Sequence, residues 1–599
     1  MEIQEKIVNV FISLYSFVWS AISLLKFYSF NATVFDLGVN VGYATYSISN
    51  LTLSKLLHVI AYKGIVYFLV PLIYAFSFQG LLIFQSFFLG LGAYPVYKIS
   101  KATLKDSNIS LILAGSYLLY YPLAGVNWFD FHYQALFPTL FLFGYWFYIS
   151  NRKLLSLFLM ALSAITHYPY TVFPFMFALM LALSKKRRED SKVWIPLLIL
   201  TSAIFLLNIK FYGPYYAIFG IVVINYNPNY LISIFTLFLI LAPLLFLPLT
   251  SKWALYLTPF IALIFLSSYD YYHYPSLFQS QYSSLYIPFV FLGAIDGLKF
   301  LERKGINLIK IVAILFIVVI AFAVAFQPYS PLNSYTPVNY NFGEIFNVNL
   351  TQYNQLMKLL SLIPKGSSIL ISNNVPEAFY PYYELHPYTY WLLNPEQIYN
   401  GSVEYILAGP VGTAYTQAFP PSSISMDYLV ENASKLGYGL YAEAYGMMLL
   451  KYNYTGPVVY YYPLQEYISA SSFDLTFPWF YKDGMIVIDN AQSVNIFSGP
   501  KMLLGPGSYA MIVFVKSSTN LSTNKMSISV YADDLTKLVA VYYIQGSMLK
   551  NGWNQIEIFF TVDKVYANLE IIGYVYNWEG ELYIKGIYIN QTGILGSTA

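Results

Sequence analysis

The run "VNVFISLYSFVWSAISLLKFYSF", residues 8–30, decides the class of this protein. It is almost wholly apolar and long enough to cross the roughly 30 Å hydrocarbon core of a bilayer as a helix. It is too long for the apolar region of a signal peptide and lacks a small-residue cleavage site. We therefore interpret it as a retained membrane span.

Composition extends this interpretation to the whole amino-terminal half. The chain has 599 residues, 57% hydrophobic, 20% aromatic and 10% charged, with a mean hydropathy of +0.54. A soluble protein carries about a quarter charged residues, so a polytopic α-helical membrane protein is predicted. The net charge of +3 favours no nucleic-acid partner. The lack of cysteine excludes disulfides, thiolate metal sites and a cysteine nucleophile.

Lysine and arginine clusters predict the orientation, because short loops rich in these residues favour the cytoplasmic side. The main clusters lie at 98–105, 185–192 and 302–310. Placing these clusters on the cytoplasmic side predicts that residues 1–326 cross the cell membrane about eleven times. The amino terminus is then cytoplasmic, and the chain after Gln327 is extracellular. The predicted spans run near 7–29, 79–98, 109–125, 134–150, 154–166, 170–184, 193–209, 229–249, 253–268, 282–299 and 306–326.

Residues 60–77, "IAYKGIVYFLVPLIYAFS", would invert this topology if they formed a further span. We interpret them instead as an interfacial helix on the outer face, with Lys63 at the level of the headgroups. Asn-X-Ser/Thr sequons, the acceptors of outer-side glycans, all fall on the predicted outer side except the one at Asn108.

The carboxyl-terminal part changes character. Short strand-like runs alternate with helical ones up to about residue 457, which predicts an external α/β domain over 327–457. Within it, "EAFYPYYELHPYTYWLL", residues 377–393, is expected to be helical. From residue 458 onward, β-type alternation dominates, in runs such as "NQIEIFFTV" at 554–562, and predicts an external β-sandwich over 458–599.

Titratable residues gather in or beside the predicted outer loops. Such a set contains hard-cation ligands and a general base. Each residue also has an ordinary structural interpretation: an aspartate beside a turn caps a helix, and a lone histidine is usually a hydrogen-bonding core residue. Because so many titratable residues share the outer face of the membrane, a functional role is favoured over these structural ones. The residues are Asp36, Asp130 and Asp270, with His58, His132, His167 and His273.

Three stretches resemble an uncharacterised family of predicted polytopic membrane proteins of archaea and bacteria. They are "VFDLGVNVGYATYSISN" at 34–50, "KGIVYFLVPLIYAFSFQGLLIFQSFFLGLGAYPVYKISK" at 63–101 and "GVNWFDFHYQALFPTLFLFGYWFY" at 125–148. The Asp-Leu-Gly of the first and the Asp-Phe-His of the third match motifs of that family. The resemblance covers residues 30–300 well and 355–455 more loosely.

That family is in turn similar in layout to the GT-C glycosyltransferases, which use lipid-linked sugars at the outer membrane face. The resemblance implies transfer of a sugar from a polyprenyl-phosphate donor to a cell-envelope glycan or glycoprotein, with Asp36 and Asp130 as the catalytic acids. It implies a divalent metal, Mg or Mn, on Asp130 and His132. The implied substrate-binding residues are Lys63, His58, His167, His273 and Asp270. If these roles hold, the carboxylates of Asp36 and Asp130 must lie within about 10 Å of each other.

A second interpretation is a non-catalytic membrane-anchored component of the cell envelope, whose external part binds surface polymers or proteins. The reduced number of acids at "THYPY", 166–170, and the large carboxyl-terminal part both favour it, and Tyr133 is a further departure from the family, whose members have proline there. A transporter is a third, weaker interpretation, because the nearly charge-free spans offer no ion path at mid-membrane.

Overall fold

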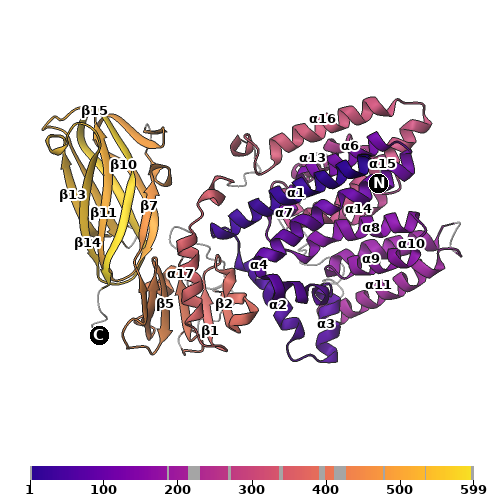
Figure 1. The fold of residues 1–599 in the computed structure, drawn as a ribbon, viewed down its shortest axis with the longest axis horizontal. Coiled ribbons are helices and arrows are strands. Elements are labelled where there is room, and N and C mark those ends of the chain that lie inside the picture. Colours follow the sequence, from indigo (N-terminus) through magenta and orange to yellow (C-terminus); the bar gives the residue numbers. More distant parts are fainter. Residues whose placement is uncertain are drawn as a thin grey trace. The chain divides into compact units, whose positions relative to one another are not determined.

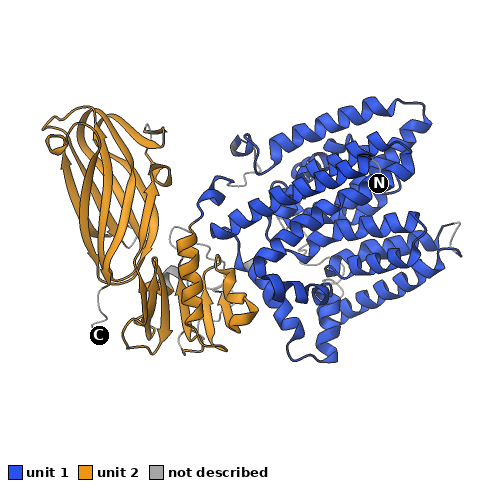
Figure 2. Ribbon diagram, viewed as in Figure 1, with its two compact units in different colours: residues 1–348 blue, residues 349–599 orange. Residues whose placement is uncertain are grey.

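The computed structural model describes residues 3–184, 188–213, 229–267, 272–335, 342–389, 398, 400–409, 426–476, 479–532 and 535–594. The chain divides into two compact units, residues 1–348 and 349–599 (Figure 2). The first is helical and the second is rich in β-structure (Figure 1). Both predicted characters are thereby confirmed, whereas the predicted domain boundaries at 326/327 and 457/458 stay predictions.

Each predicted apolar segment contains a helix of unit 1, whereas the helix at 39–48 and most of the one at 53–63 lie outside those segments. Helices α8 to α11 lie side by side and contact one another (Figure 1). The helices are α1 (Ile3–Tyr28), α2 (Val39–Ile48), α3 (Leu53–Lys63), α4 (Val66–Leu91), α5 (Ala93–Leu104), α6 (Ser107–Leu119), α7 (Tyr121–Trp128), α8 (Phe137–Ile149), α9 (Lys153–Ala164), α10 (Val172–Ala182), α11 (Ser191–Tyr212), α13 (Tyr230–Leu241), α14 (Ala254–Leu266), α15 (Ile287–Arg303) and α16 (Leu308–Phe326).

Few of these helices are long enough to cross a bilayer alone. Among the described residues, four are both long and apolar enough: α1, the continuous α4–α5 segment, α11 and α16. The pair α6 and α7, bent by 41°, makes a fifth if it acts as one span. Length and composition thus support four or five crossings, and the predicted eleven are not confirmed.

Helix α4 is broken at Ser77, whose backbone has φ 55° and ψ −154°. The break lies where the predicted interfacial segment at 60–77 meets the predicted span at 79–98. It brings the chain so close to itself that a Cβ on Gly80 would lie 2.0 Å from the Cβ of Phe76. Only glycine fits there, so the sequence itself marks the bend.

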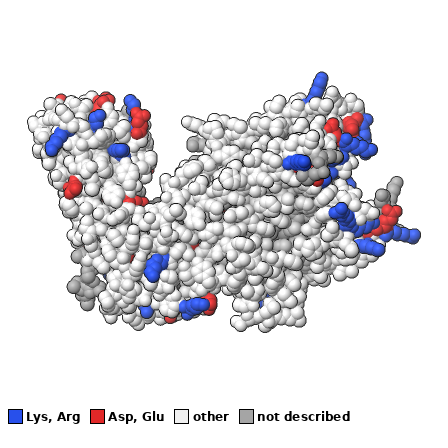
Figure 3. Space-filling view, in the orientation of Figure 1, with Lys and Arg blue, Asp and Glu red and all other residues white. Residues whose placement is uncertain are grey.

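Charged side chains gather at one end of unit 1. Figure 3 shows them around the end where Figure 1 marks the amino terminus, while the broad middle of the visible face is free of them. Two ion pairs belong to this end: Lys98 to Glu5 at 2.8 Å and Lys153 to Asp190 at 3.1 Å. An apolar middle with most of the visible charges gathered at one end is the distribution expected of a membrane-embedded bundle.

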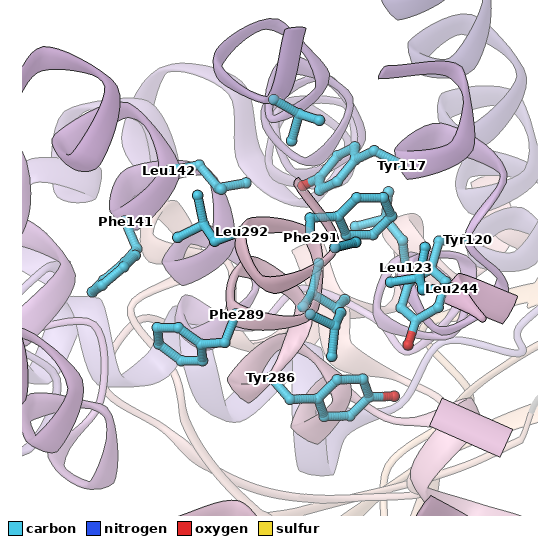
Figure 4. Packing of buried hydrophobic residues seen from close by; sticks show 14 of the residues in the cluster. Tyr117, Tyr120, Leu123, Phe141, Leu142, Leu244, Tyr286, Phe289, Phe291 and Leu292 are labelled. Atoms are coloured by element: carbon cyan, nitrogen blue, oxygen red, sulfur yellow. The ribbon is translucent and has the colours of Figure 1, made fainter. Parts of the chain in front are cut away.

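Aromatic rings fill the core of the bundle. Phe291 of α15 packs edge-on against Tyr117 and Tyr120, and Phe289 packs against Phe141 of α8 (Figure 4). The buried Tyr120 hydroxyl donates to the carbonyl of Ile240 at 2.8 Å, which satisfies its polar end. These contacts join α6, α8, α13 and α15 into one rigid support for the loops at their ends.

Unit 2 contains two sheets. The first has the strand order β2-β1-β3-β5-β4-β6, with β1 parallel to β2 and β3, and β5 antiparallel to both β3 and β4. Its elements are α17 (Leu350–Ser361), β1 (Ser368–Ile371), β2 (His386–Thr389), β3 (Tyr405–Ala408), α19 (Met426–Glu431), β4 (Tyr438–Ala444), β5 (Met447–Tyr452) and β6 (Tyr460–Tyr462).

The second sheet has nine strands, and the long strands β10 and β15 pair antiparallel along most of their length. Its strands are β7 (Gln465–Ser469), β8 (Asp474–Leu475), β9 (Phe480–Lys482), β10 (Met485–Leu504), β11 (Gly507–Ser517), β12 (Lys525–Ala532), β13 (Lys537–Gln545), β14 (Asn554–Val562) and β15 (Tyr566–Ile594). The run at 554–562 is strand β14, as predicted.

The predicted helix over 377–393 is wrong. The described part of this stretch holds two short turns, Pro376–Phe379 and Pro381–Tyr383, followed by strand β2. Pro381 and Pro387 lack a backbone N–H and clash with the preceding turn, so they break a helix that the aromatic spacing otherwise suggests.

Candidate active site

A polar cluster lies where α1 ends, at the opposite end of that helix from Glu5. Helix α1 rises about 1.5 Å per residue, so its Lys26 lies roughly 30 Å along the axis from the Glu5 end. Next to Lys26 come the short turn η1 (Val34–Gly38), which carries Asp36, and the segment between α7 and the turn η2 (Tyr133–Leu136), which carries Asp130 and His132.

Asp130 is held from two sides. Its Oδ1 accepts from Lys26 Nζ at 2.8 Å, and its Oδ2 accepts from the Thr33 backbone N–H at 2.8 Å and the Thr33 hydroxyl at 3.0 Å. The Lys26 ammonium also donates to the carbonyl of Trp128 at 2.9 Å. Asp130 has φ 25°, a backbone conformation that costs free energy and persists where the surroundings enforce it.

Asp36 lies beside Asp130 and binds His132. The Asp36 Oδ1 lies 3.0 Å from His132 Nε2, and Asp36 Oδ2 lies 3.2 Å from the same Thr33 hydroxyl that touches Asp130. Because both carboxylates reach one hydroxyl, their separation is well within the 10 Å that the catalytic hypothesis requires. Neither acid caps its own helix: the turns η1 and η2 have no side-chain cap.

Two amides fix the backbone that presents these groups. Gln85 of α4 donates to the Asp130 carbonyl at 2.8 Å and accepts from the His132 N–H at 2.9 Å. Asn40 donates to the carbonyls of Asp36 at 2.7 Å and Phe131 at 2.9 Å. The segment after α7 is therefore tied to α4 on one side and to α2 on the other.

Lys63, at the end of α3, is buried beside the acids and forms no ion pair with any residue that the structure describes. Its ammonium donates to Asn40 Oδ1 at 3.0 Å and lies over the rings of Tyr43, Tyr62 and Tyr133. Burial lowers the pKa of Lys63 to about 8, against the raising effect of Asp36. Lys63 thus joins the predicted site, and Tyr133 contributes a ring and a hydroxyl that donates to the Asn40 carbonyl.

His167 and His58 lie in an aromatic group next to Lys63. The ring of Tyr62 is 5.3 Å from that of His167 and 5.5 Å from that of Tyr168, and it packs against Tyr212. The Tyr212 hydroxyl lies 3.0 Å from His58 Nε2. Burial, with Lys63 and His132 nearby, lowers the pKa of His167 well below its usual value.

Two predicted site residues lie elsewhere or outside the described chain. His273 binds the carbonyl of Ile264, at the end of α14, at 2.7 Å. Asp270 lies outside the described residues. The structure therefore brings together Asp36, Asp130, His132, Lys63 and His167, extends the group to His58 through Tyr212, and places His273 against a helix end.

Sequence reasoning missed Lys26, Thr33, Asn40 and Gln85. Lys26 and Gln85 lie within otherwise apolar helices, and a polar side chain in such a helix is itself a functional signal. Thr33 and Asn40 carry no such signal, because small polar residues are common in loops and at helix starts.

The donor atoms do not fit a divalent metal. Among the described residues, no group of three or more histidine, aspartate or glutamate side chains is placed to hold one. The predicted ligands Asp130 and His132 face different partners, since Lys26 and Thr33 engage both Asp130 oxygens and His132 Nε2 faces Asp36.

A family model described as "Predicted membrane protein (DUF2079)" matches residues 46–219 and 215–449, more than half of the chain. The chain belongs to this family. The DUF2079 match contains Lys63, Asp130, His132 and His167, and it begins after Asp36. It confirms the family resemblance seen in the sequence.

No curated protein matches the chain. Similar solved structures cover about a fifth of it. The carbohydrate-binding domain CBM6 of LamC from Zobellia galactanivorans has 14% identity and TM-score 0.17 over 21% of this chain and 99% of that domain. The module CBM6cm-2 of Cellvibrio mixtus lichenase 5A has 14% identity and TM-score 0.16 over 21% of this chain and 97% of that module. A family two carbohydrate esterase from Cellvibrio japonicus has 13% identity and TM-score 0.16 over 23% and 36%. Likenesses at these scores carry no conclusion about this chain.

Proposed function

We propose that the protein is a membrane glycosyltransferase that moves a sugar from a polyprenyl-phosphate donor to a hydroxyl of an envelope glycan or glycoprotein. The observation that supports it best is the meeting of Asp36 and Asp130 at one hydroxyl, that of Thr33, at the end of an apolar helix. A lipid-linked donor is amphipathic, so a site at a helix end lets the sugar reach the acids while the tail stays in the bilayer.

The contacts divide the work between the two acids. A general base needs an oxygen that can accept a proton from the attacking hydroxyl. Both oxygens of Asp130 are engaged, and its side chain is 4% exposed. Asp36 is 13% exposed, and within the described chain its Oδ2 accepts only from the Thr33 hydroxyl, which has Asp130 as an alternative acceptor. Asp36 is thus the base, and Asp130 is a positioning residue.

The reaction follows from this division. The acceptor hydroxyl replaces Thr33 at Asp36 Oδ2 and attacks the anomeric carbon of the donor sugar. Its proton passes to Asp36 as the new C–O bond forms, and the bond from the anomeric carbon to the phosphate oxygen breaks, releasing the lipid phosphate. In its Nε2–H tautomer, His132 donates to Asp36 Oδ1 and orients the carboxylate.

The positions of the charges support an outward-facing site. Lysine and arginine side chains gather at the end of unit 1 that carries the Glu5–Lys98 pair, and the acids lie at the other end of α1 (Figure 3). If the positive end is cytoplasmic, as the rule for short loops requires, the acids face outward, on the side where the extracellular unit 2 is predicted.

A transfer assay on membranes containing the full chain tests the proposal. With sugar-charged polyprenyl phosphate as donor, Asp36→Asn lowers the rate by about 10²–10⁴-fold, the usual contribution of a general base. Asp483→Asn is the matched control, because Asp483 is an exposed turn residue of unit 2 with φ 50°, which asparagine tolerates. A wild-type protein that transfers no sugar, or equal rates in D36N and D483N, contradicts the proposal.

A second candidate function, binding of envelope polymers by unit 2, is favoured by one feature of its second sheet. Tyr543 of β13 and Tyr574 and Tyr576 of β15, which we call the tyrosine platform, lie together across the intervening strand β12. Tyr543 is 48% and Tyr576 38% exposed, and Lys525 lies 4.9 Å and 5.3 Å from their ring centres. Exposed rings with amphipathic faces are typical of recognition surfaces.

Co-sedimentation of the full chain with isolated envelope polysaccharide tests this second function. The double change of Tyr543 and Tyr576 to alanine is expected to lower binding at least tenfold. Tyr467→Ala, which removes an equally exposed tyrosine of β7, leaves it unchanged. Retention of binding by the double variant assigns the platform a purely structural role.

A further inference from the structure

We propose that Lys63 and His167 form an anion site that binds the phosphate of a membrane lipid, next to the acid pair but separate from it. The inference rests on the proposed function for the identity of that lipid, a polyprenyl phosphate. The binding of a lipid phosphate as such is inferred from the geometry of the site alone.

Lys63 has donors to spare. An ammonium has three N–H groups, and Asn40 Oδ1 at 3.0 Å is its hydrogen-bond partner, with ring faces around the rest. No carboxylate of the described chain lies within ion-pair distance of Lys63 Nζ. A charge taken out of water without a counterion costs free energy, and an arriving anion recovers that cost.

His167 supplies a second donor. Its side chain is 8% exposed, and among the described residues its Nδ1 is buried without a hydrogen-bond partner. Buried polar atoms without partners are rare and indicate an unfilled role. The Tyr62 ring joins the two residues, with Lys63 Nζ 5.0 Å and the His167 ring 5.3 Å from it. The lowered pKa of His167 keeps it neutral, so it donates one N–H to a phosphate oxygen without repelling Lys63.

The surroundings fit a lipid rather than a free phosphate. The helices next to Lys63 expose large apolar side chains: Ile48 at 41%, Leu51 at 57%, Leu53 at 72% and Phe68 at 56%. They come from α2, the loop after it, α3 and α4, which lie together at one end of unit 1 (Figure 1). Exposed apolar side chains on the elements that flank a buried cation suit a ligand with an acyl or prenyl tail and a phosphate head.

Binding measured on the full chain in phosphatidylcholine nanodiscs tests the site, with a polyprenyl monophosphate in one arm and inorganic phosphate in the other. We expect Lys63→Met to weaken lipid binding at least tenfold, the loss of one charge-assisted hydrogen bond or more. His167→Phe weakens it about threefold, and Lys63→Arg, which keeps the charge, restores most of it. Lys55→Met is the matched control, because Lys55 is a half-buried lysine of the same helix whose ammonium binds Ser49 rather than the proposed site.

The outcomes separate this inference from the proposed function. Asp36→Asn, measured below pH 7 so that Lys63 stays charged without Asp36, should keep lipid binding while losing transfer. If the wild-type protein binds the lipid but transfers no sugar, the proposed glycosyltransferase function is contradicted and the proposed lipid-phosphate site is retained. Equal binding by wild type and K63M, or by K63M and K63R, overturns the site, and tight binding of inorganic phosphate overturns its assignment to a lipid.

Discussion

The two ends of helix α1 carry the same kind of ion pair in different surroundings. Near the amino terminus, Lys98 and Glu5 meet at 2.8 Å with side chains 24% and 16% exposed. At the other end, Lys26 and Asp130 meet at the same 2.8 Å with side chains 12% and 4% exposed. The wetter pair is joined by one further side chain, Tyr94, whose hydroxyl donates to Glu5 at 2.6 Å. The buried pair binds backbone groups of two further segments.

The difference between the two ion pairs shows which of them is held in a fixed geometry by its surroundings. A partly exposed pair contributes little because water competes for both charges. A buried pair repays its desolvation only when every lone pair and proton is satisfied, and Asp130 meets that condition through Lys26 and Thr33. Distance alone therefore does not distinguish a surface contact from a built site.

The largest expected effect follows from breaking the buried pair. Asp130→Asn leaves the Lys26 charge uncompensated, and we expect it to lower the free energy of unfolding by about 3–5 kcal/mol. Glu5→Gln at the wetter end is expected to cost about 1 kcal/mol or less. Reversible unfolding of the purified chain in mixed detergent measures both.

A double variant serves as control for that prediction. Lys26→Met combined with Asp130→Leu removes both charges and should lose less stability than Asp130→Asn alone, because apolar replacement of a buried pair is often close to neutral. Equal losses from D130N and E5Q would show that burial makes no difference at these two sites.

Glu443, a buried acid that accepts from an amide rather than from a cation, extends the comparison, and we expect an effect of intermediate size on stability. Glu443 of β4 is 0% exposed and accepts from the Gln591 amide at 2.7 Å, and burial raises its pKa from 4.5 to about 7. Its contribution to stability is complete below pH 4.5 and is lost as the pH rises through about 7, since the unfolded state releases the proton first. The loss amounts to about 3 kcal/mol at most.

Hydrogen exchange of strand β4 in the full chain, corrected for intrinsic rates, measures this effect. Protection should be greater at pH 5 than at pH 8, and Glu443→Gln should reduce the difference. In the Glu443→Gln variant, protection should still fall somewhat as the pH rises, because burial also raises the pKa of Glu466 to about 7. Greater protection at pH 8 would contradict the assignment.

The smallest effect concerns the unpaired cation. The pKa of Lys63, about 8, means that the ammonium is present at pH 7 and largely lost at pH 9. Anion binding, which needs the charged form, should therefore fall roughly tenfold over that interval. Asp36, which favours the charged form, and the neighbouring His132 and His167 are the other titratable groups around it. Lys63→Arg should abolish the pH dependence, and a wild-type affinity that is flat from pH 7 to 9 would contradict it.

Much of the fold could be predicted from the sequence because its signals are local. Apolar runs fixed the positions of the helices, and period-two alternation located strands such as β14. The number of crossings could not be read in the same way, because helices such as α9 and α10, 12 and 11 residues long, need packing partners to decide their depth. The helix expected at 377–393 is not formed in the described part of that stretch, because Pro381 and Pro387 disfavour it.

The site was predictable in its charged members and not in its supports. Asp36, Asp130, His132, Lys63 and His167 stood out because titratable groups are rare in this chain. Thr33 and Asn40 did not, since their roles depend on backbone atoms from segments far apart in sequence. The pairing of His132 with Asp36 rather than with Asp130 was equally invisible, because it depends on how the chain turns at Asp130.

One carboxamide links the two halves of the site. The nitrogen of Asn40 secures the backbone of Asp36 and Phe131, while its oxygen holds the Lys63 ammonium. If an anion bound at the proposed site drew Lys63 away, Asn40 would lose that ammonium while still holding the Asp36 backbone, so binding of the proposed donor would be felt at Asp36 through Asn40. An aspartate at position 40 would lack the two N–H groups and would cut this communication while adding a charge.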